Sequence, residues 1–141
     1  MADQFEPDFL TVEDVLDIHQ DVLETFGGEA GVRDLGLLES AVAQPSTSFD
    51  GVYLHNNLFL MAAAYLFHLT QNHALIDGNK RTGLVAALTF LRINGVSMPP
   101  DLDIFYDLTI GVATGTQTKA DVATEFQRLA ENTLPETAED V

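Results

Sequence analysis

The chain has 141 residues, the usual size of one domain, with 46% hydrophobic and 20% charged residues. This composition supports a folded core and excludes wholesale disorder. Its 22 acidic residues outnumber the 6 basic ones, giving a net charge of −16. Because phosphate groups attract cationic surfaces, this charge disfavours direct partners among nucleic acids and anionic membranes.

The strong acidity also suits a medium of high salt. At 1 M salt the Debye length is about 3 Å, which weakens repulsion among carboxylates. We therefore hypothesise a halophilic source; an acidic mesophilic protein is the alternative. The chain has no cysteine, which excludes disulfides and thiolate metal sites. The first residues lack the pattern of a secretory signal, and the longest mostly apolar stretch, 58–69, is too short to span a membrane. We expect a cytoplasmic protein.

The first predicted helix covers residues 12–26, where apolar side chains recur at helical spacing. Thr11 and Asp14 form a capping box at its start, and two glycines follow its end. His19 lies on the apolar face, and we interpret it as a hydrogen-bonded packing residue rather than a catalytic one. A second, short helix is predicted over 34–42, with the first of these residues as its N-cap.

Residues 44–56 carry turn-forming residues at both ends and predict an exposed loop or a short hairpin. The next helix, over 58–69, is apolar around much of its circumference, which predicts a central position. Further helices are predicted up to residue 94, from 102 to about 115, and from 118 onward. Thr118 and Asp121 form a second capping box at the start of the last helix.

Six predicted helices without a convincing strand indicate an all-α fold, a compact six-helix bundle with a flap loop or short hairpin. We expect one domain over 1–134. Residues 135–141 are acidic and lack periodicity, which predicts a flexible tail.

The six basic residues include one adjacent pair, Lys80 and Arg81, at the predicted start of the fourth helix. Asn79 is a suitable N-cap for this helix, and Gly78 lets a ligand approach the backbone. A helix N-terminus leaves backbone N–H groups free at the positive end of the helix dipole. These features together indicate a phosphate-binding site.

His73 and Asp77 precede this site. A histidine can take up a proton near neutral pH, and a carboxylate is a suitable ligand for Mg²⁺, so the combination fits phosphoryl or nucleotidyl transfer. The alternatives are a side-chain pair that fixes a loop, a solvated cationic face, or a zinc site formed by His68, His73 and Asp77.

Residues 73–83, HALIDGNKRTG, resemble the signature of the Fic/Doc superfamily, His-x-Phe-x-Asp/Glu-Gly-Asn-x-Arg. The residues at matching positions are His73, Asp77, Gly78, Asn79 and Arg81. Lys80 in the variable position resembles the Doc, or death-on-curing, branch, and segments 28–45 and 107–115 extend the resemblance. Leu75 replaces the usual phenylalanine, and we expect it to pack beneath the loop.

The resemblance implies that His73 is the base acting on a target hydroxyl and that Asp77 holds Mg²⁺. The residues it implies for binding the phosphates of ATP are Gly78, Asn79, Lys80 and Arg81. In this family a flap at the position of 44–56 docks the target as an added strand. The docking residues implied here are Ser46, Thr47, Ser48, Phe49 and Tyr53. An ordinary connection between helices is the alternative.

The resemblance implies a toxin that transfers phosphate from ATP to a serine or threonine of a protein such as a translation elongation factor. Adenylyl transfer, the Fic reaction, is the alternative. An antitoxin acting in trans is expected, because the internal inhibitory motif is incomplete: Thr25 and Glu29 have the spacing, but Ala30 follows. A rival from another class is a non-catalytic acidic helical module that binds a basic partner, which would leave the Lys80–Arg81 pair unexplained.

Overall fold

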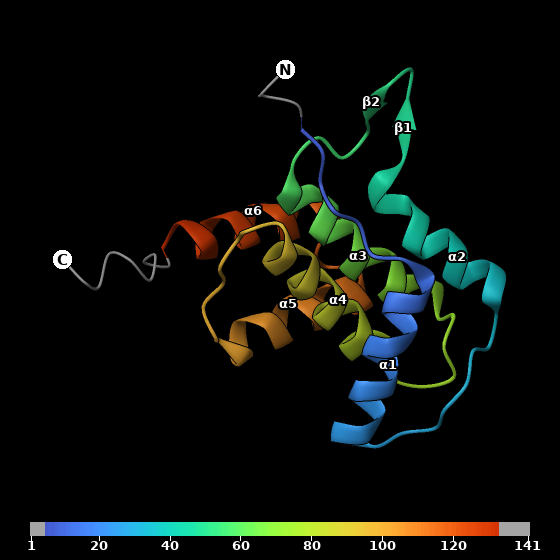
Figure 1. Cartoon of the computed structure of the whole chain (residues 1–141). Coiled ribbons are helices and arrows are strands. Elements are labelled where there is room, and N and C mark those ends of the chain that lie inside the picture. Colours follow the sequence, from blue (N-terminus) through green and yellow to red (C-terminus); the bar gives the residue numbers. More distant parts are fainter. Residues whose placement is uncertain (1–4, 133–141) are drawn as a thin grey trace.

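The computed structural model describes residues 5–132, which form six α-helices, one 3₁₀ turn and one hairpin (Figure 1). The helices are α1 (Val12–Phe26), α2 (Leu35–Ala43), α3 (Leu58–Asn72), α4 (Asn79–Ile93), α5 (Leu102–Thr114) and α6 (Lys119–Glu131). The all-α prediction is confirmed. The predicted tail, 135–141, lies outside the described residues. No helix in the described part is long and apolar enough to cross a membrane.

Two helices begin at the predicted capping boxes. In α1 the Thr11 hydroxyl accepts from the Asp14 N–H, and the Asp14 carboxylate accepts from the Thr11 N–H. Thr118 and Asp121 exchange the same pair of bonds at the start of α6. Each box satisfies two backbone donors that a helix start otherwise leaves unpaired.

Helix α3 forms the centre of the bundle and contacts α2, α4, α5 and α6. Residues 61–66 on α3 are completely buried, which confirms the central position predicted from its apolar circumference. Burial also raises the pKa of Tyr65 to about 12, and its hydroxyl accepts a hydrogen bond from the Leu10 N–H at 2.8 Å. The N-terminal segment is thereby tied to the core.

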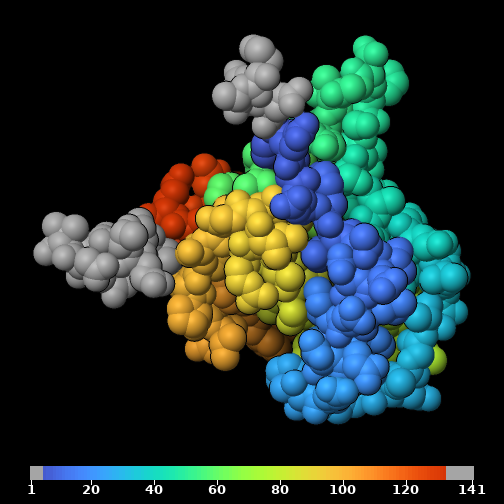
Figure 2. All heavy atoms as spheres, in the orientation of Figure 1, coloured from blue at the N-terminus to red at the C-terminus, as the bar shows by residue number. Residues whose placement is uncertain are grey.

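The hairpin consists of β1 (Ser48–Phe49) and β2 (Val52–Tyr53), preceded by the 3₁₀ turn Gln44–Ser46. Its two turn residues, Asp50 and Gly51, both have positive φ, the backbone geometry of a tight two-residue hairpin turn. The strands extend away from the helices, and the space-filling view shows the hairpin projecting from the helical body (Figures 1 and 2).

The α1–α2 and α3–α4 loops lie side by side. Val32 and Leu75 form an isolated antiparallel bridge, and the Ile76 N–H donates to the Gly31 carbonyl at 3.0 Å. The Leu75 side chain is 2% exposed, which confirms its expected packing beneath the loop. These contacts fix the α3–α4 loop, which carries the predicted motif.

Candidate active site

The N-terminus of α4 differs from those of the other five α-helices in the described residues. Its N-cap, Gly78, has a left-handed backbone (φ 79°) and provides no side-chain cap. The other five helices have side-chain caps, from Thr11, Asp34, Asn57, Asp101 and Thr118. Within the described residues, the N–H groups of Asn79, Lys80 and Arg81 meet no acceptor. Three free donors at the positive end of a helix dipole suit an anion.

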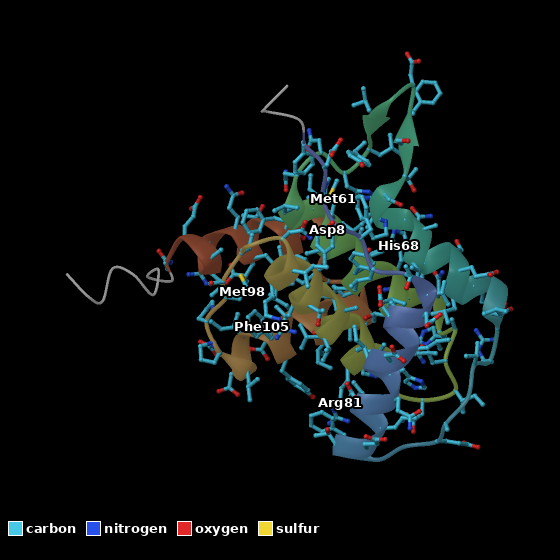
Figure 3. The ribbon with its side chains drawn as sticks, in the orientation of Figure 1. Asp8, Met61, His68, Arg81, Met98 and Phe105 are labelled. Atoms are coloured by element: carbon cyan, nitrogen blue, oxygen red, sulfur yellow. The ribbon has the colours of Figure 1, made fainter. Side chains whose placement is uncertain are left out.

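The two adjacent cations flank these free donors. Lys80 and Arg81 are both exposed. The Arg81 guanidinium lies 4.3 Å from the centroid of the Phe26 ring at the end of α1, a cation–π contact. Figure 3 shows Arg81 near that end of α1. The site therefore combines free backbone donors with two accessible positive charges.

Backbone donors hold the Asp77 carboxylate on both of its oxygens. Oδ1 accepts from the Gly78 N–H at 2.9 Å, and Oδ2 accepts from the Glu29 N–H at 3.1 Å. Gly28 passes so close that a Cβ there would lie 2.9 Å from Oδ2. Asp77 remains exposed, and each carboxylate oxygen has a second lone pair for a cation. Neither Gly28 nor Glu29 belongs to the motif at 73–83, so their contact with Asp77 is visible only in the structure.

His73 is the C-cap of α3 and has a left-handed backbone conformation, with φ 50° and ψ 42°. A residue other than glycine rarely adopts this conformation, which costs about 1 to 2 kcal/mol. His73 is exposed, and its ring nitrogens form no hydrogen bond with the described residues. The ring is therefore accessible for exchanging a proton with a bound molecule.

The prediction that the Asn79 side chain caps α4 is wrong. Asn79 is the first residue of the helix, and its amide instead pairs with the backbone of Leu75. The Oδ1 atom accepts from the Leu75 N–H at 3.0 Å, and Nδ2 donates to the Leu75 carbonyl at 2.9 Å. These bonds satisfy two backbone groups in the motif loop and explain why the side chain does not cap the helix.

His19 has the structural role predicted for it. It is 5% exposed, and its Nε2 lies 2.8 Å from the Asp77 carbonyl oxygen. The ring thus anchors the backbone of the motif loop to α1.

The zinc alternative is wrong, because His68 lies in a different cluster. Its Nε2 is 3.0 Å from the Lys119 Nζ, which is also 3.2 Å from the His55 Nε2. Burial, assisted by Lys119 and His55, lowers the pKa of His68 from 6.5 to about 4. Within the described residues, no group of three or more histidines or carboxylates is placed to hold a metal ion.

The predicted docking residues lie on or next to the hairpin. The hydroxyls of Ser46 and Thr47 donate to the Ala43 carbonyl, and the Phe49 side chain is 76% exposed. Ser48 pairs with Tyr53 across the hairpin, and the Tyr53 ring packs against two phenylalanines of the N-terminal segment. The hairpin precedes α3 and the motif follows it, so a helix about 22 Å long separates them.

A cavity of about 520 Å³ lies between α5 and α6, away from the motif. Its lining residues are Ile104, Asp107, Leu108, Gln117, Asp121, Thr124, Glu125 and Arg128. The motif residues are absent from this lining, so the candidate site is the exposed N-terminus of α4 and not this cavity.

The comparisons with known proteins agree with the motif. A family model described as the Fic/DOC family matches residues 9–91. The chain is 54% identical over 79 residues to the toxin Doc of Mycolicibacterium smegmatis, a match covering 56% of this chain and 61% of that relative. It is 34% identical over 124 residues to the protein kinase doc of Escherichia phage P1, covering 85% of this chain and 94% of that relative. The chain belongs to the Fic/Doc family.

Proposed function

We propose that the chain is a Doc-like toxin that transfers phosphate from ATP to a serine or threonine hydroxyl of a protein. The observation that carries this proposal is the N-terminus of α4, where three free N–H groups adjoin Lys80 and Arg81 directly after His73 and Asp77. The name of one relative, toxin Doc, supports the toxin part of the proposal, and the name of the other, protein kinase doc, supports phosphate transfer.

In this reaction the target oxygen forms a bond to the γ-phosphorus while the bond to the β,γ-bridging oxygen breaks, and ADP leaves. The His73 imidazole accepts the hydroxyl proton, and the first turn of α4 holds the phosphates. Lys80 and Arg81 offset charge on the transferred group. Adenylyl transfer uses the same residues with attack at the α-phosphorus and release of pyrophosphate. We favour phosphoryl transfer because Lys80 resembles the Doc branch.

Asp77 fits the role of a Mg²⁺ ligand. Mg²⁺ is usually held by one or two carboxylates together with phosphate oxygens and water, so a single exposed carboxylate beside a phosphate site suffices. The hydrogen bonds from Glu29 and Gly78 fix that carboxylate in place. When bound, the ion would neutralise charge on the phosphates.

The target and the inhibitor are also part of the proposal. The free edges of the hairpin and the exposed Phe49 suit an added strand from the target, such as a translation elongation factor. A target docked there must extend along α3 to bring its hydroxyl to His73. We propose inhibition by an antitoxin in trans, and a cytoplasmic location follows from such a target.

Mass spectrometry of the modified target tests the reaction. The purified chain is incubated with ATP, Mg²⁺ and a candidate elongation factor, and the mass gained by the factor is measured. A gain of one phosphate supports the proposal, whereas a gain of one adenylyl group establishes the Fic reaction instead. A double variant, Lys80→Gln with Arg81→Gln, provides the control and should lose most ATP binding, because each hydrogen bond to a charged group contributes about 1.5 to 3 kcal/mol. Unchanged binding would place the nucleotide elsewhere.

A further inference from the structure

The side chain of Arg33, in the α1–α2 loop, binds the end of α3 where His73 lies. Its Nε donates to the His73 carbonyl at 2.6 Å, and its Nη2 donates to the Asn72 carbonyl at 3.3 Å. These two carbonyls belong to the last residue and the C-cap of α3. Carbonyls at a helix end lack partners within the helix, so the guanidinium satisfies two of them from another segment.

The charge of Arg33 also suits this position. Helix α3 has no basic residue in its own last turn, although a cation near a helix C-terminus is favourable. The chain has only six lysines and arginines. The one ion pair among the described residues joins Arg128 to Glu125. The Arg33 guanidinium therefore has no carboxylate partner there and binds the two carbonyls instead. The chain offers 22 acidic residues as partners, yet the Arg33 guanidinium binds two backbone carbonyls, which indicates a specific role at the end of α3.

The backbone conformation of His73 needs such support. A left-handed histidine is strained and persists only where surrounding contacts hold it. The N–H groups of Arg33 and Asp34 both donate to the Ala74 carbonyl, at 2.7 and 3.0 Å, so the main chain of this loop fixes the residue after His73. The Arg33 side chain binds the carbonyl of Asn72, the residue before, and that of His73 itself. The chain is therefore held on both sides of the strained residue.

We propose that Arg33 is a positioning residue, which holds His73 in its left-handed conformation and so fixes the direction in which the imidazole leaves the backbone. This inference rests on the proposed function, because it assigns to Arg33 the orientation of the proposed base. A lysine cannot replace it fully, because one ammonium group lacks the planar fork that serves two carbonyls at once.

The first arm of the test needs no enzymatic activity. Backbone NMR shifts of His73 and Ala74 are compared in the wild-type chain, in Arg33→Gln and in Arg92→Gln. Arg92 lies exposed at the far end of α4, so its variant removes one positive charge without affecting the motif loop. We expect Arg33→Gln alone to shift the His73 signals away from the left-handed conformation. Unchanged signals in a folded Arg33→Gln chain would overturn the proposal.

The second arm measures transfer to the target. We expect Arg33→Gln to lower kcat by at least about tenfold, the size of one lost charge-assisted hydrogen bond, with little change in KM for ATP. Ethylguanidinium added to the assay should restore part of the kcat of Arg33→Gln. The kcat of Arg33→Lys should lie between that of the wild type and that of Arg33→Gln. A wild-type kcat in Arg33→Gln would overturn the positioning role and leave the proposed function intact. If the wild-type chain itself transfers nothing, the proposed function fails, and the NMR arm still decides whether Arg33 holds His73.

Discussion

The guanidinium of Arg81 lies over the ring of Phe26, with its Cζ 4.3 Å from the ring centroid. The guanidinium N–H groups form no hydrogen bond with the described residues, so they remain available for phosphate. Phe26 thereby orients a residue of the proposed phosphate site from the end of a different helix.

We expect Phe26→Leu to weaken binding of ATP with Mg²⁺ by roughly two- to fivefold, because an exposed cation–π contact is worth about 0.5 to 1 kcal/mol. Phe26→Tyr keeps an aromatic face and should bind as the wild type does. Isothermal titration calorimetry measures both affinities. Tighter binding in Phe26→Leu would instead mean that the ring competes with the nucleotide for Arg81.

The cluster of His55, His68 and Lys119 predicts a pH dependence of stability. The Lys119 ammonium donates to Nε2 of both rings, so Nε2 of each ring must carry no proton and both imidazoles must be neutral. Burial lowers the pKa of His55 as well as that of His68, which falls to about 4. In the unfolded chain these histidines bind protons near pH 6.5, so the unfolded state gains protons first as the pH falls. The contribution to stability is complete above pH 6.5 and is lost as the pH falls toward about 4.

Thermal unfolding of the wild type and of His68→Gln checks this expectation. Glutamine retains an oxygen that can accept from Lys119 but does not titrate. The wild-type melting temperature should fall more steeply than that of His68→Gln between about pH 7 and pH 4. The carboxylates titrate in both proteins, so the difference between the two curves isolates the histidine. Parallel curves would contradict the shifted pKa of His68.

Local patterns predicted the helices well, because each depends on neighbours in the sequence. Apolar spacing and the two capping boxes placed α1 and α6, and both boxes form as predicted. The site was predictable only in part. The Asn79 amide can form hydrogen bonds either with the start of its own helix or with the backbone of Leu75. Residue spacing does not show which of these partners it binds, and the structure shows that it binds Leu75. Arg33 is 40 residues from His73, and no short motif marks a contact over such a separation.

The net charge of −16 predicts that the fold needs salt. Among the described residues the ion pair is Arg128 with Glu125, so most carboxylates lack a nearby cation to offset their repulsion. We expect the melting temperature to rise steeply with KCl toward molar concentration, as the Debye length falls to about 3 Å. NaCl at equal ionic strength should act similarly, and sucrose, which does not screen charge, is the control. A melting temperature independent of KCl would contradict the halophile hypothesis and leave the proposed enzyme unaffected.

Substitution of His73 separates catalysis from binding. His73→Asn is preferable to His73→Ala, because asparagine tolerates the left-handed conformation that this position requires. Asparagine cannot accept a proton near neutral pH, so turnover should fall by about 10² to 10⁴, the usual contribution of a general base. The affinity for ATP with Mg²⁺ should stay close to that of the wild type, since the phosphates bind the start of α4.

Asp77→Asn gives the contrasting result. It keeps one acceptor for the backbone donors of Glu29 and Gly78 but removes the charge offered to Mg²⁺. We expect this variant to lose metal-dependent ATP affinity together with turnover, because a metal ligand acts before the reaction as well as during it. In cells that carry the target, the wild-type chain should arrest growth and His73→Asn should not. If both arrest growth equally, toxicity comes from binding alone, and the acidic helical module replaces the enzyme as the explanation.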